Sequence, residues 1–287
     1  MIEPWQEELF HEQGFLIVND VFSADEIAEL QSVFDGWVDE SREHAEAYGE
    51  TLDGRHRFDP DSDHSAAHPS LRRVASPTEI SSGYYQAACH SRMTGIAARL
   101  IGPGLRFHHS KINSKLPGTR TEVKWHQDFL FTPHSNDDLV TALLMVSDVT
   151  ADNGPLQVIP GSHRGPLYSH WQDGRFRGAI DERHLAEQRQ SPVSCQGTAG
   201  SVCFMHTRLL HASAANQSPR PRTLFITVYA AEDAWPLAGN PLPSVHERRI
   251  VAGEESGQIR CVSNSFALPE MPKGASFFEQ QAGDRAG

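Results

Sequence analysis

Apolar residues in the first third of the chain follow two different spacings. The compact apolar run at residues 14–22 predicts a short strand. Ser23 and Glu26 then have the spacing of a capping box, and the apolar residues after them recur at helical spacing, which predicts a helix to about Tyr48. Two further elements are predicted before residue 105, namely a polar, flexible loop or lid at 49–70 and a helix at 79–100.

Beyond residue 104 the chain consists of short apolar runs separated by turn residues, which is typical of strands. The order of elements, helices first and many short strands later, predicts an α+β fold with a mainly β core. We expect an antiparallel double sheet of the jelly-roll or cupin type, with the helices packed outside it. The predicted strands cover residues 105–116, 121–129, 139–149, 155–159, 193–195, 200–205 and 222–231.

The length of 287 residues fits one large domain, and no evident linker or internal repeat divides it. In this interpretation residues 1–104 support a β core at 105–235, and residues 236–287 form a C-terminal extension. Apolar residues make up 38% of the chain and charged residues 22%, values close to those of ordinary globular proteins. The pattern of the sequence does not indicate an oligomeric state.

Charge and cysteine content narrow the classes of partner and location. The 25 Lys+Arg and 37 Asp+Glu give a net charge of −12, which excludes a general binder of nucleic acid or anionic membranes, because such proteins need a positive field. The first residues are acidic and lack the apolar run of a signal peptide, so we expect a cytoplasmic protein. The 4 cysteines form no C-x-x-C pair and are predicted to be buried, reduced and structural.

One His-x-Asp segment stands out among the 16 histidines. His126 and Asp128 lie on the predicted strand 121–129, where residues two apart face the same side at a spacing of about 7 Å. Their imidazole and carboxylate can therefore converge on a metal ion. Composition alone predicts about two His-x-acid triplets, and the other one, His44-Ala45-Glu46, lies on a predicted helix where such residues diverge.

A second segment completes the pattern of a metal site. His211 stands at the far end of a predicted buried strand, and Arg222 opens the next strand eleven positions later. Two imidazoles and one carboxylate, with the other coordination positions open, are the facial triad of non-haem Fe(II) oxygenases. A fixed arginine nearby supplies the bidentate contact that a co-substrate carboxylate needs. These four residues together predict an Fe(II) oxygenase.

The same segments resemble the phytanoyl-CoA dioxygenase-like family of Fe(II)/2-oxoglutarate oxygenases. The resemblance lies in Trp125-His-Gln-Asp128, in the stretch 152–163 and in the block 211–222, and it extends from about residue 14 to residue 235. It implies a double-stranded β-helix. It also implies that a small molecule is hydroxylated at an unactivated C–H bond, while O2 and 2-oxoglutarate are converted to succinate and CO2.

The resemblance further implies roles for individual residues. His126, Asp128 and His211 would be the iron ligands, and Arg222 would pair with the distal carboxylate of 2-oxoglutarate. Asn113, on the strand before the His-x-Asp segment, is the best candidate for a further contact with 2-oxoglutarate, and Gln127 is a lesser one. Related halogenases have a small residue in place of the carboxylate, so Asp128 favours hydroxylation, with desaturation as a lesser alternative.

The substrate is indicated only by charge and by loop position. Lys111, Lys115, Arg120 and Arg208 place positive charge near the metal-bearing strands of an acidic protein. This favours an anionic or zwitterionic substrate such as an amino acid, a phosphonate, an acyl acid or a natural-product intermediate. The residues that we expect to contact the substrate are Lys111, His134, Trp171 and Arg208.

Two alternatives remain at this point. One is a cupin-like metalloenzyme that does not use 2-oxoglutarate, in which Arg222 would have no role. The other is a non-catalytic jelly-roll binding module whose histidines are incidental. In each case the partner is a small molecule.

Overall fold

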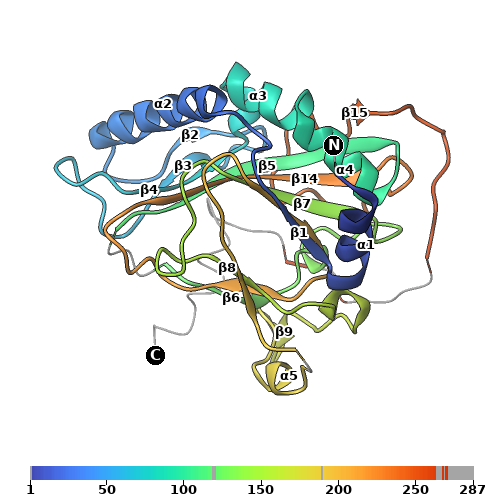
Figure 1. The fold of residues 1–287 in the computed structure, drawn as a ribbon. Helices are drawn as coiled ribbons and strands as arrows, with labels where there is room; N and C mark the ends of the chain where they lie inside the picture. Colours follow the sequence, from blue (N-terminus) through green and yellow to red (C-terminus); the bar gives the residue numbers. More distant parts are fainter. Residues whose placement is uncertain (1, 118–120, 189, 263–266, 268, 271–287) are drawn as a thin grey trace.

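A large antiparallel sheet of nine strands forms the main layer within the described residues (Figure 1). The computed structural model describes residues 2–117, 121–188, 190–262, 267, 269 and 270. Arg120 and, in the predicted C-terminal extension, residues 263–266, 268 and 271–287 lie outside the described residues. The order of the sheet is β1 (Phe15–Val18), β12 (Val202–His206), β7 (Leu139–Met145), β14 (Arg222–Ala231), β5 (Leu105–Lys115), β4 (Leu71–Ala75), β3 (His56–Pro60) and β2 (Tyr48–Glu50), and β15 (Ile250–Ala252) also pairs with β5.

A smaller antiparallel sheet lies below the large one in Figure 1, where β6 and β8 face it. Its order is β11 (Val193–Cys195), β8 (Leu156–Val158), β13 (His211–Ser213) and β6 (Val123–His126). A two-stranded hairpin, β9 (Trp171–Gln172) and β10 (Arg175–Phe176), projects beyond the smaller sheet together with the one-turn helix α5 (Arg183–Ala186). The space between the two sheets is therefore lined by strands from both.

Helices cover the outer face of the large sheet (Figure 1). Two tyrosine hydroxyls tie this layer together: Tyr84 donates to the Leu30 carbonyl at 2.9 Å, and Tyr229 donates to the Ala88 carbonyl at 2.6 Å. The helices are α1 (Pro4–Gln13), α2 (Ala24–Glu40), α3 (Ser82–Cys89) and α4 (Arg92–Ile101), and the 3-10 turns are η1 (Ser41–Glu43), η2 (Pro77–Glu79), η3 (Asp128–Leu130) and η4 (Ser162–Arg164).

Alternation along the strands divides the apolar side chains between two cores. On β14, Leu224 and Ile226 belong to the core between the sheets, whereas Phe225 packs into the core under the helices. In the core between the two sheets, polar side chains lie beside these apolar ones on the same strands. The site described below lies in this inter-sheet space.

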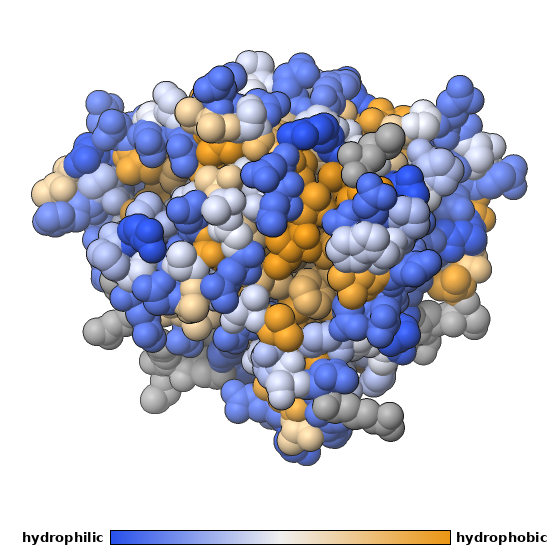
Figure 2. Space-filling model, viewed as in Figure 1, coloured by the Kyte–Doolittle hydropathy of each residue, from blue (hydrophilic) through white to orange (hydrophobic). Residues whose placement is uncertain are grey.

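The face of the molecule seen in Figure 2 is largely polar, with apolar side chains gathered near its middle, where Figure 1 places β1. β1 is an edge strand of the large sheet, and its residues Phe15 and Ile17 are only partly buried against the inner core. Within the described residues, no helix has both the length and the apolar content needed to cross a membrane.

The mainly β core with helices before it is confirmed, as are several of the predicted elements. β5, β11 and β14 lie at the predicted positions, with β11 and β14 matching both ends. The capping box is formed as predicted, because Ser23 Oγ accepts from the Glu26 amide at 3.3 Å and Glu26 Oε2 accepts from the Ser23 amide at 2.7 Å.

The predicted helix boundaries are wrong in two places. The first long helix ends at Glu40 rather than near Tyr48, which instead begins β2. The second is divided into α3 and α4 at Ser91, whose hydroxyl caps the new helix by accepting from the Met93 amide at 3.2 Å. Helix α1 lies outside the predicted elements because Phe10 is its one buried residue, so its apolar periodicity is weak.

The predicted loop at 49–70 is also wrong, since it contains the end of β2 and all of β3. These strands extend the edge of the large sheet, because β3 pairs with β4 and β2 pairs with β3, and the Tyr48 and Phe58 rings stack at 4.6 Å. Pairing with the next strand along the chain, not an apolar pattern, makes this polar segment extended. The prediction of buried cysteines is confirmed for Cys89, Cys195 and Cys203 but wrong for Cys261, which is exposed.

Candidate metal centre

His126, Asp128 and His211 come together between the two sheets. His126 ends β6 and lies directly opposite His211 on β13, and their ring centroids are 4.0 Å apart. Asp128 Oδ1 lies 3.4 Å from His126 Nε2 and 3.5 Å from His211 Nε2. In the part of the chain that the structure describes, this is the one group of three such side chains with ligand atoms close enough to hold one metal ion.

Asp128 reaches this position in a way that the strand argument did not predict. The strand ends at His126, and Asp128 is the first residue of the 3-10 turn η3. The turn folds the carboxylate back toward the two imidazoles, where an extended strand would have carried it farther along. The predicted convergence is present, but the predicted strand through residue 129 is wrong.

Backbone carbonyls set the tautomer of both histidines. Nδ1–H of His126 donates to the Lys124 carbonyl at 2.7 Å, and Nδ1–H of His211 donates to the Leu209 carbonyl at 2.9 Å. Because a carbonyl only accepts, each Nδ1 carries the proton and each Nε2 presents a lone pair toward Asp128. This is the arrangement that holds imidazole ligands in register around a metal.

The protonation states also suit a metal ion. Burial, together with the adjacent His211, lowers the pKa of His126 and keeps its ring neutral. Burial alone would raise the pKa of Asp128, but the two imidazoles outweigh it and hold that pKa well below its usual value. Thr141 Oγ1 donates to Asp128 Oδ2 at 3.0 Å and orients the carboxylate. Two imidazoles and one carboxylate fit Fe(II).

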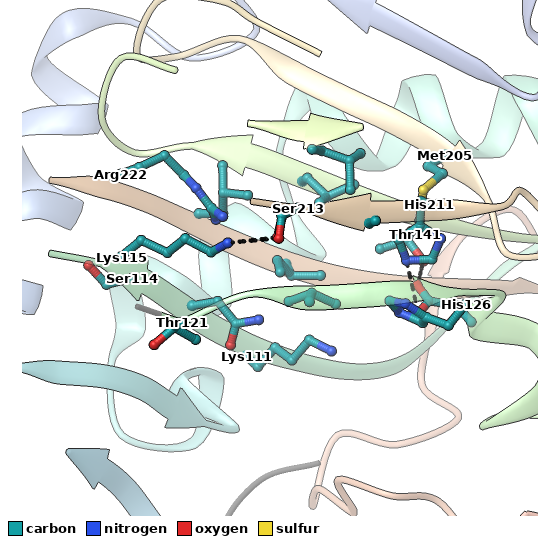
Figure 3. A pocket seen from close by; sticks show the side chains of 18 of the residues that line it. Lys111, Ser114, Lys115, Thr121, His126, Thr141, Met205, His211, Ser213 and Arg222 are labelled. Carbon is teal, nitrogen blue, oxygen red and sulfur yellow. Dashed lines mark hydrogen bonds and ion pairs between the residues drawn. The ribbon is translucent and has the colours of Figure 1, made fainter. Parts of the chain in front are cut away.

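A cavity between the sheets connects the triad to Arg222 at the start of β14 (Figure 3). The Arg222 side chain is buried, and its Nε–H donates to the Gly154 carbonyl at 3.1 Å. Burial lowers the pKa of Arg222 to about 10, so the guanidinium stays charged at neutral pH. A buried cation facing a cavity requires an anionic partner or strong hydrogen bonds.

Lys115 and Asn113 lie near Arg222 on β5 and line the same cavity (Figure 3 labels Lys115). Lys115 Nζ donates to Ser213 Oγ at 2.8 Å and to the carbonyl of Ala214. Burial, and then Arg222, lower the pKa of Lys115 to about 6. Among the described residues, the buried Oδ1 of Asn113 has no hydrogen-bond partner, so the Asn113 amide at this end of the cavity can form a further hydrogen bond.

Lys111 occupies the wall between this cavity and a second one beside the triad. Residues 111, 113 and 115 are two apart along β5 and therefore face the same side of the strand, as their spacing predicts. Both cavities are lined by Lys111, His126 and Asp128. Burial, followed by the charge of Arg73, lowers the pKa of Lys111 to about 8. Lys111 thus lies where a substrate next to the metal would contact it.

Gln127 points away from both cavities. Its Nε2 donates to the carbonyls of Arg208 at 2.7 Å and Pro166 at 3.2 Å, and its Oε1 accepts from the Tyr168 amide at 2.9 Å. These contacts fasten the loop around residue 166 to the metal-bearing segment. The structure therefore places Gln127 in a supporting position, apart from the site expected for 2-oxoglutarate.

Three of the predicted substrate contacts also lie outside the walls of the two cavities. Arg208 pairs with Asp137 at 2.6 Å. His134 is buried with its Nδ1–H donating to the Thr132 carbonyl at 2.8 Å, and burial lowers its pKa to about 4. Trp171 packs edge-on against Phe176 in the β9–β10 hairpin. A position in a predicted loop was therefore not sufficient to identify residues that line the two cavities.

Lys115, Ser213, Thr141 and Arg73 line the cavities without having been predicted as site residues. Lys115 was detectable in the sequence, because it continues the alternation of Lys111 and Asn113 on one strand. No pattern in the sequence indicated Arg73. It lies far from the triad along the chain, and only the pairing of β4 with β5 brings it to the site.

The comparison with known families supports the same assignment. The model of the family described as "Phytanoyl-CoA dioxygenase (PhyH)" matches residues 10–224. The chain belongs to this family. It is accordingly an iron- and 2-oxoglutarate-dependent dioxygenase, as the sequence predicted.

Two curated relatives match over most of their length. A probable alpha-ketoglutarate-dependent hypophosphite dioxygenase of Stutzerimonas stutzeri is 29% identical over 270 residues, which cover 92% of this chain and 91% of that protein. An ectoine dioxygenase of Sphingopyxis alaskensis is 31% identical over 254 residues, covering 80% of this chain and 76% of that protein. The solved structure of the ectoine dioxygenase EctD from S. alaskensis with bound Fe superposes with a TM-score of 0.67 at 26% identity, covering 91% of this chain and 87% of that one.

Proposed function

We propose that this protein hydroxylates a small anionic or zwitterionic metabolite at an unactivated C–H bond. The observation that carries the proposal is one inter-sheet cavity with a His-Asp-His triad at one end and the buried Arg222 guanidinium at the other. The relatives named after hypophosphite and ectoine support a substrate of this size and charge. An amino acid, a phosphonate, an acyl acid and a natural-product intermediate all fit this class.

The proposal assigns the triad to the metal. His126 and His211 bind iron through Nε2, Asp128 binds it through its carboxylate, and Thr141 holds that carboxylate in place. When bound, iron and 2-oxoglutarate supply the oxidising chemistry, in which O2 converts 2-oxoglutarate to succinate and CO2 and hydroxylates the substrate.

Arg222, Asn113 and Lys115 hold the distal carboxylate of 2-oxoglutarate in this proposal. The guanidinium pairs with it, the Asn113 amide donates to it, and Lys115 turns its ammonium from Ser213 toward it. Leucines and isoleucine from both sheets line the cavity between its two ends and exclude water, namely Leu143, Leu156, Leu224 and Ile226. Lys111 contacts the anionic group of the substrate next to the metal ligands.

We also propose that the two sheets form a double-stranded β-helix and that residues 1–287 are one oxygenase domain. β1 and β4 from the N-terminal segment and β15 from the C-terminal extension pair with strands of the 105–235 core, and β3 and β2 continue the same sheet beyond β4, which supports a single unit. The cytoplasmic location stays a prediction.

Anaerobic titration with Fe(II) and then 2-oxoglutarate tests the reaction class. We expect a visible charge-transfer band when 2-oxoglutarate chelates the iron, loss of the band in Asp128→Ala, and a weaker affinity for 2-oxoglutarate in Arg222→Met. No iron uptake by the wild type would leave the non-catalytic binding module. Full substrate oxidation by Arg222→Met without added 2-oxoglutarate would leave the cupin-like alternative.

A further inference from the structure

The wall of the second cavity beside the triad combines polar and apolar side chains. The polar part includes His126 and Asp128 of the triad. The apolar part comes from segments that are far apart along the chain, namely Phe131, Val228, Pro241 and Leu242. A molecule in this cavity therefore meets the candidate metal ligands and an apolar surface at the same time.

Pro241 and Leu242 belong to a loop, residues 232–249, that connects β14 to β15. Arg106 on β5 holds both ends of this loop, because its Nε–H donates to the Glu232 carbonyl at 2.9 Å and its Nη1–H donates to the Arg248 carbonyl at 3.1 Å. A loop whose ends lie close together in this way is a compact Ω-type unit. The middle of this loop is the part that lines the cavity.

Hydrogen bonds to two other segments fix the middle of the loop. Asn240 Nδ2–H donates to the His108 carbonyl on β5 at 3.0 Å, and Asn240 Oδ1 accepts from the Leu242 amide at 2.9 Å. The guanidinium of Arg55, which lies between β2 and β3, donates to the Pro241 carbonyl. Both polar groups of the peptide bond between Pro241 and Leu242 are thus hydrogen-bonded, so the backbone that carries the Leu242 side chain has a defined position.

Val228 adds an apolar side chain from the large sheet. It follows Ile226 on β14 by two residues and therefore points into the same inter-sheet space. Strand pairing places Val228 between His109 on β5 and Thr141 on β7. Because Thr141 donates to the Asp128 carboxylate, Val228 lies next to the triad.

Leu242 and Val228 are buried without being part of a hydrophobic core. Leu242 is 4% exposed and Val228 is 3% exposed. Neither belongs to any of the hydrophobic clusters that buried apolar side chains form within the described residues. Apolar surface that faces a small cavity instead of a packed core is suited to the hydrocarbon part of a ligand.

We propose that Leu242 determines the size of the substrate, because it forms with Val228 the apolar wall against which the hydrocarbon part of the substrate packs. The inference rests on the proposed function, and it narrows the substrate class to small acids and amino acids with a short hydrocarbon chain. The cavity measures about 50 Å³, where one water molecule needs ~10–15 Å³, so it holds only a few groups of that size. Larger members of the proposed substrate class do not fit.

Two series of probes with increasing chain length test the size limit. One series is the straight-chain carboxylates from acetate to hexanoate, and the other is the straight-chain amino acids from glycine to L-norleucine. Isothermal titration calorimetry of the anaerobic Fe(II)–2-oxoglutarate complex measures each dissociation constant, and the charge-transfer band reports the complex itself. In at least one series we expect the affinity of the wild type to rise about fourfold per methylene group up to an optimum chain length and to fall beyond it.

Substitutions assign the size limit to the apolar wall. Leu242→Ala should move the optimum to a longer chain and raise the affinity for that probe by about fourfold or more, whereas Leu242→Phe should move the optimum to a shorter chain. Val228→Ala enlarges the cavity from the strand and should act like Leu242→Ala. Leu237→Ala, the same change at an exposed leucine of the same loop, is the matched control and should keep the wild-type optimum. The affinity for 2-oxoglutarate should be unchanged in all four variants.

The two proposals fail in different ways. If the charge-transfer band forms but no probe binds, or if the optimum chain length is the same in the wild type, Leu242→Ala and Leu242→Phe, the size-limiting role is refuted and the oxygenase assignment stands. A uniform loss of affinity in Leu242→Ala without a shift of the optimum also refutes it. If the band does not form in the wild type, the oxygenase assignment itself fails. Thermal unfolding identifies a variant that does not fold, and Val228→Ala then decides the question.

Discussion

Two neighbouring basic side chains, at the end of the cavity where we propose that 2-oxoglutarate binds, differ in pKa. Arg222 has a pKa of about 10 and is charged throughout the physiological range. Lys115 has a pKa of about 6, because burial and then the charge of Arg222 oppose its protonation, while Glu122 favours it. Lys115 is therefore largely neutral near pH 7 until an anion arrives beside it.

Binding of 2-oxoglutarate should accordingly depend on pH through Lys115. A carboxylate stabilises the ammonium form, so the pKa of Lys115 rises on binding and a proton is taken up above pH 6. The dissociation constant for 2-oxoglutarate should then increase as pH rises from 6 to 8, by at most about tenfold per pH unit. Titration of the Fe(II)-saturated protein at several pH values measures this slope.

Lys115→Met should remove most of the slope and weaken binding at pH 6 more than at pH 8. Arg92→Met, which changes an exposed basic residue at the start of α4, is the control and should keep the wild-type slope. An unchanged slope in Lys115→Met would mean that another group takes up the proton.

At the scale of elements, the sequence predicted what local patterns determine. β14 and β11 were predicted to the residue because apolar runs with turn residues at both ends define them. β2 and β3 were not predicted, because they become strands only by pairing at the sheet edge, β3 with β4 and β2 with β3. The three residues of β13 were not predicted as a strand, because they become extended only by pairing with β6 and β8 on either side.

The same distinction explains the site. His126, Asp128, His211 and Arg222 could be proposed as site residues because their types and order form a pattern along the chain, even though Asp128 lies on a 3-10 turn. Arg73 could not be identified, since only its pairing opposite Asn113 brings it to the cavity. The Gln127 side chain contacts the loop around residue 166 rather than the cavities, because sequence adjacency to a candidate ligand does not determine where a side chain points.

The junction between α3 and α4 depends on one hydroxyl. Ser91 Oγ accepts from the Met93 amide at 3.2 Å and donates to the Ala87 carbonyl at 2.7 Å, so it both starts α4 and ends α3. Ser91→Ala should lower the free energy of unfolding by about 1 kcal/mol, the usual cost of losing an N-cap. Urea unfolding measures the difference. Ser62→Ala, whose hydroxyl contacts only the neighbouring Asp61 among described residues, should change it little, and an equal loss in both would contradict the capping role.

At the scale of the whole molecule, the two halves of the site belong to different sheets. The imidazole ligands come from β6 and β13 of the smaller sheet, and Asp128 follows β6 directly. Arg222, Asn113 and Lys115 come from β14 and β5 of the large sheet. A molecule of 2-oxoglutarate that contacts both the metal and Arg222 therefore joins the two layers across the inter-sheet space.

This arrangement predicts that the two ligands stabilise the fold in steps. Fe(II) should raise the melting temperature under anaerobic conditions, and 2-oxoglutarate should raise it further only when iron is present. A ligand at about 1,000 times its dissociation constant adds about 4 kcal/mol to the free energy of unfolding. Differential scanning calorimetry measures both increments.

Arg222→Met separates the contribution of the metal from that of the bridge between sheets. The variant should keep the Fe(II) increment, because the triad is intact, and lose most of the 2-oxoglutarate increment, because the contact with the large sheet is gone. In the wild type alone, chelation of the metal and bridging of the two sheets both contribute to the increase in melting temperature and cannot be separated. If the variant retained the full 2-oxoglutarate increment, the co-substrate would be held by the metal alone, and the burial of Arg222 in the cavity wall would need a different explanation.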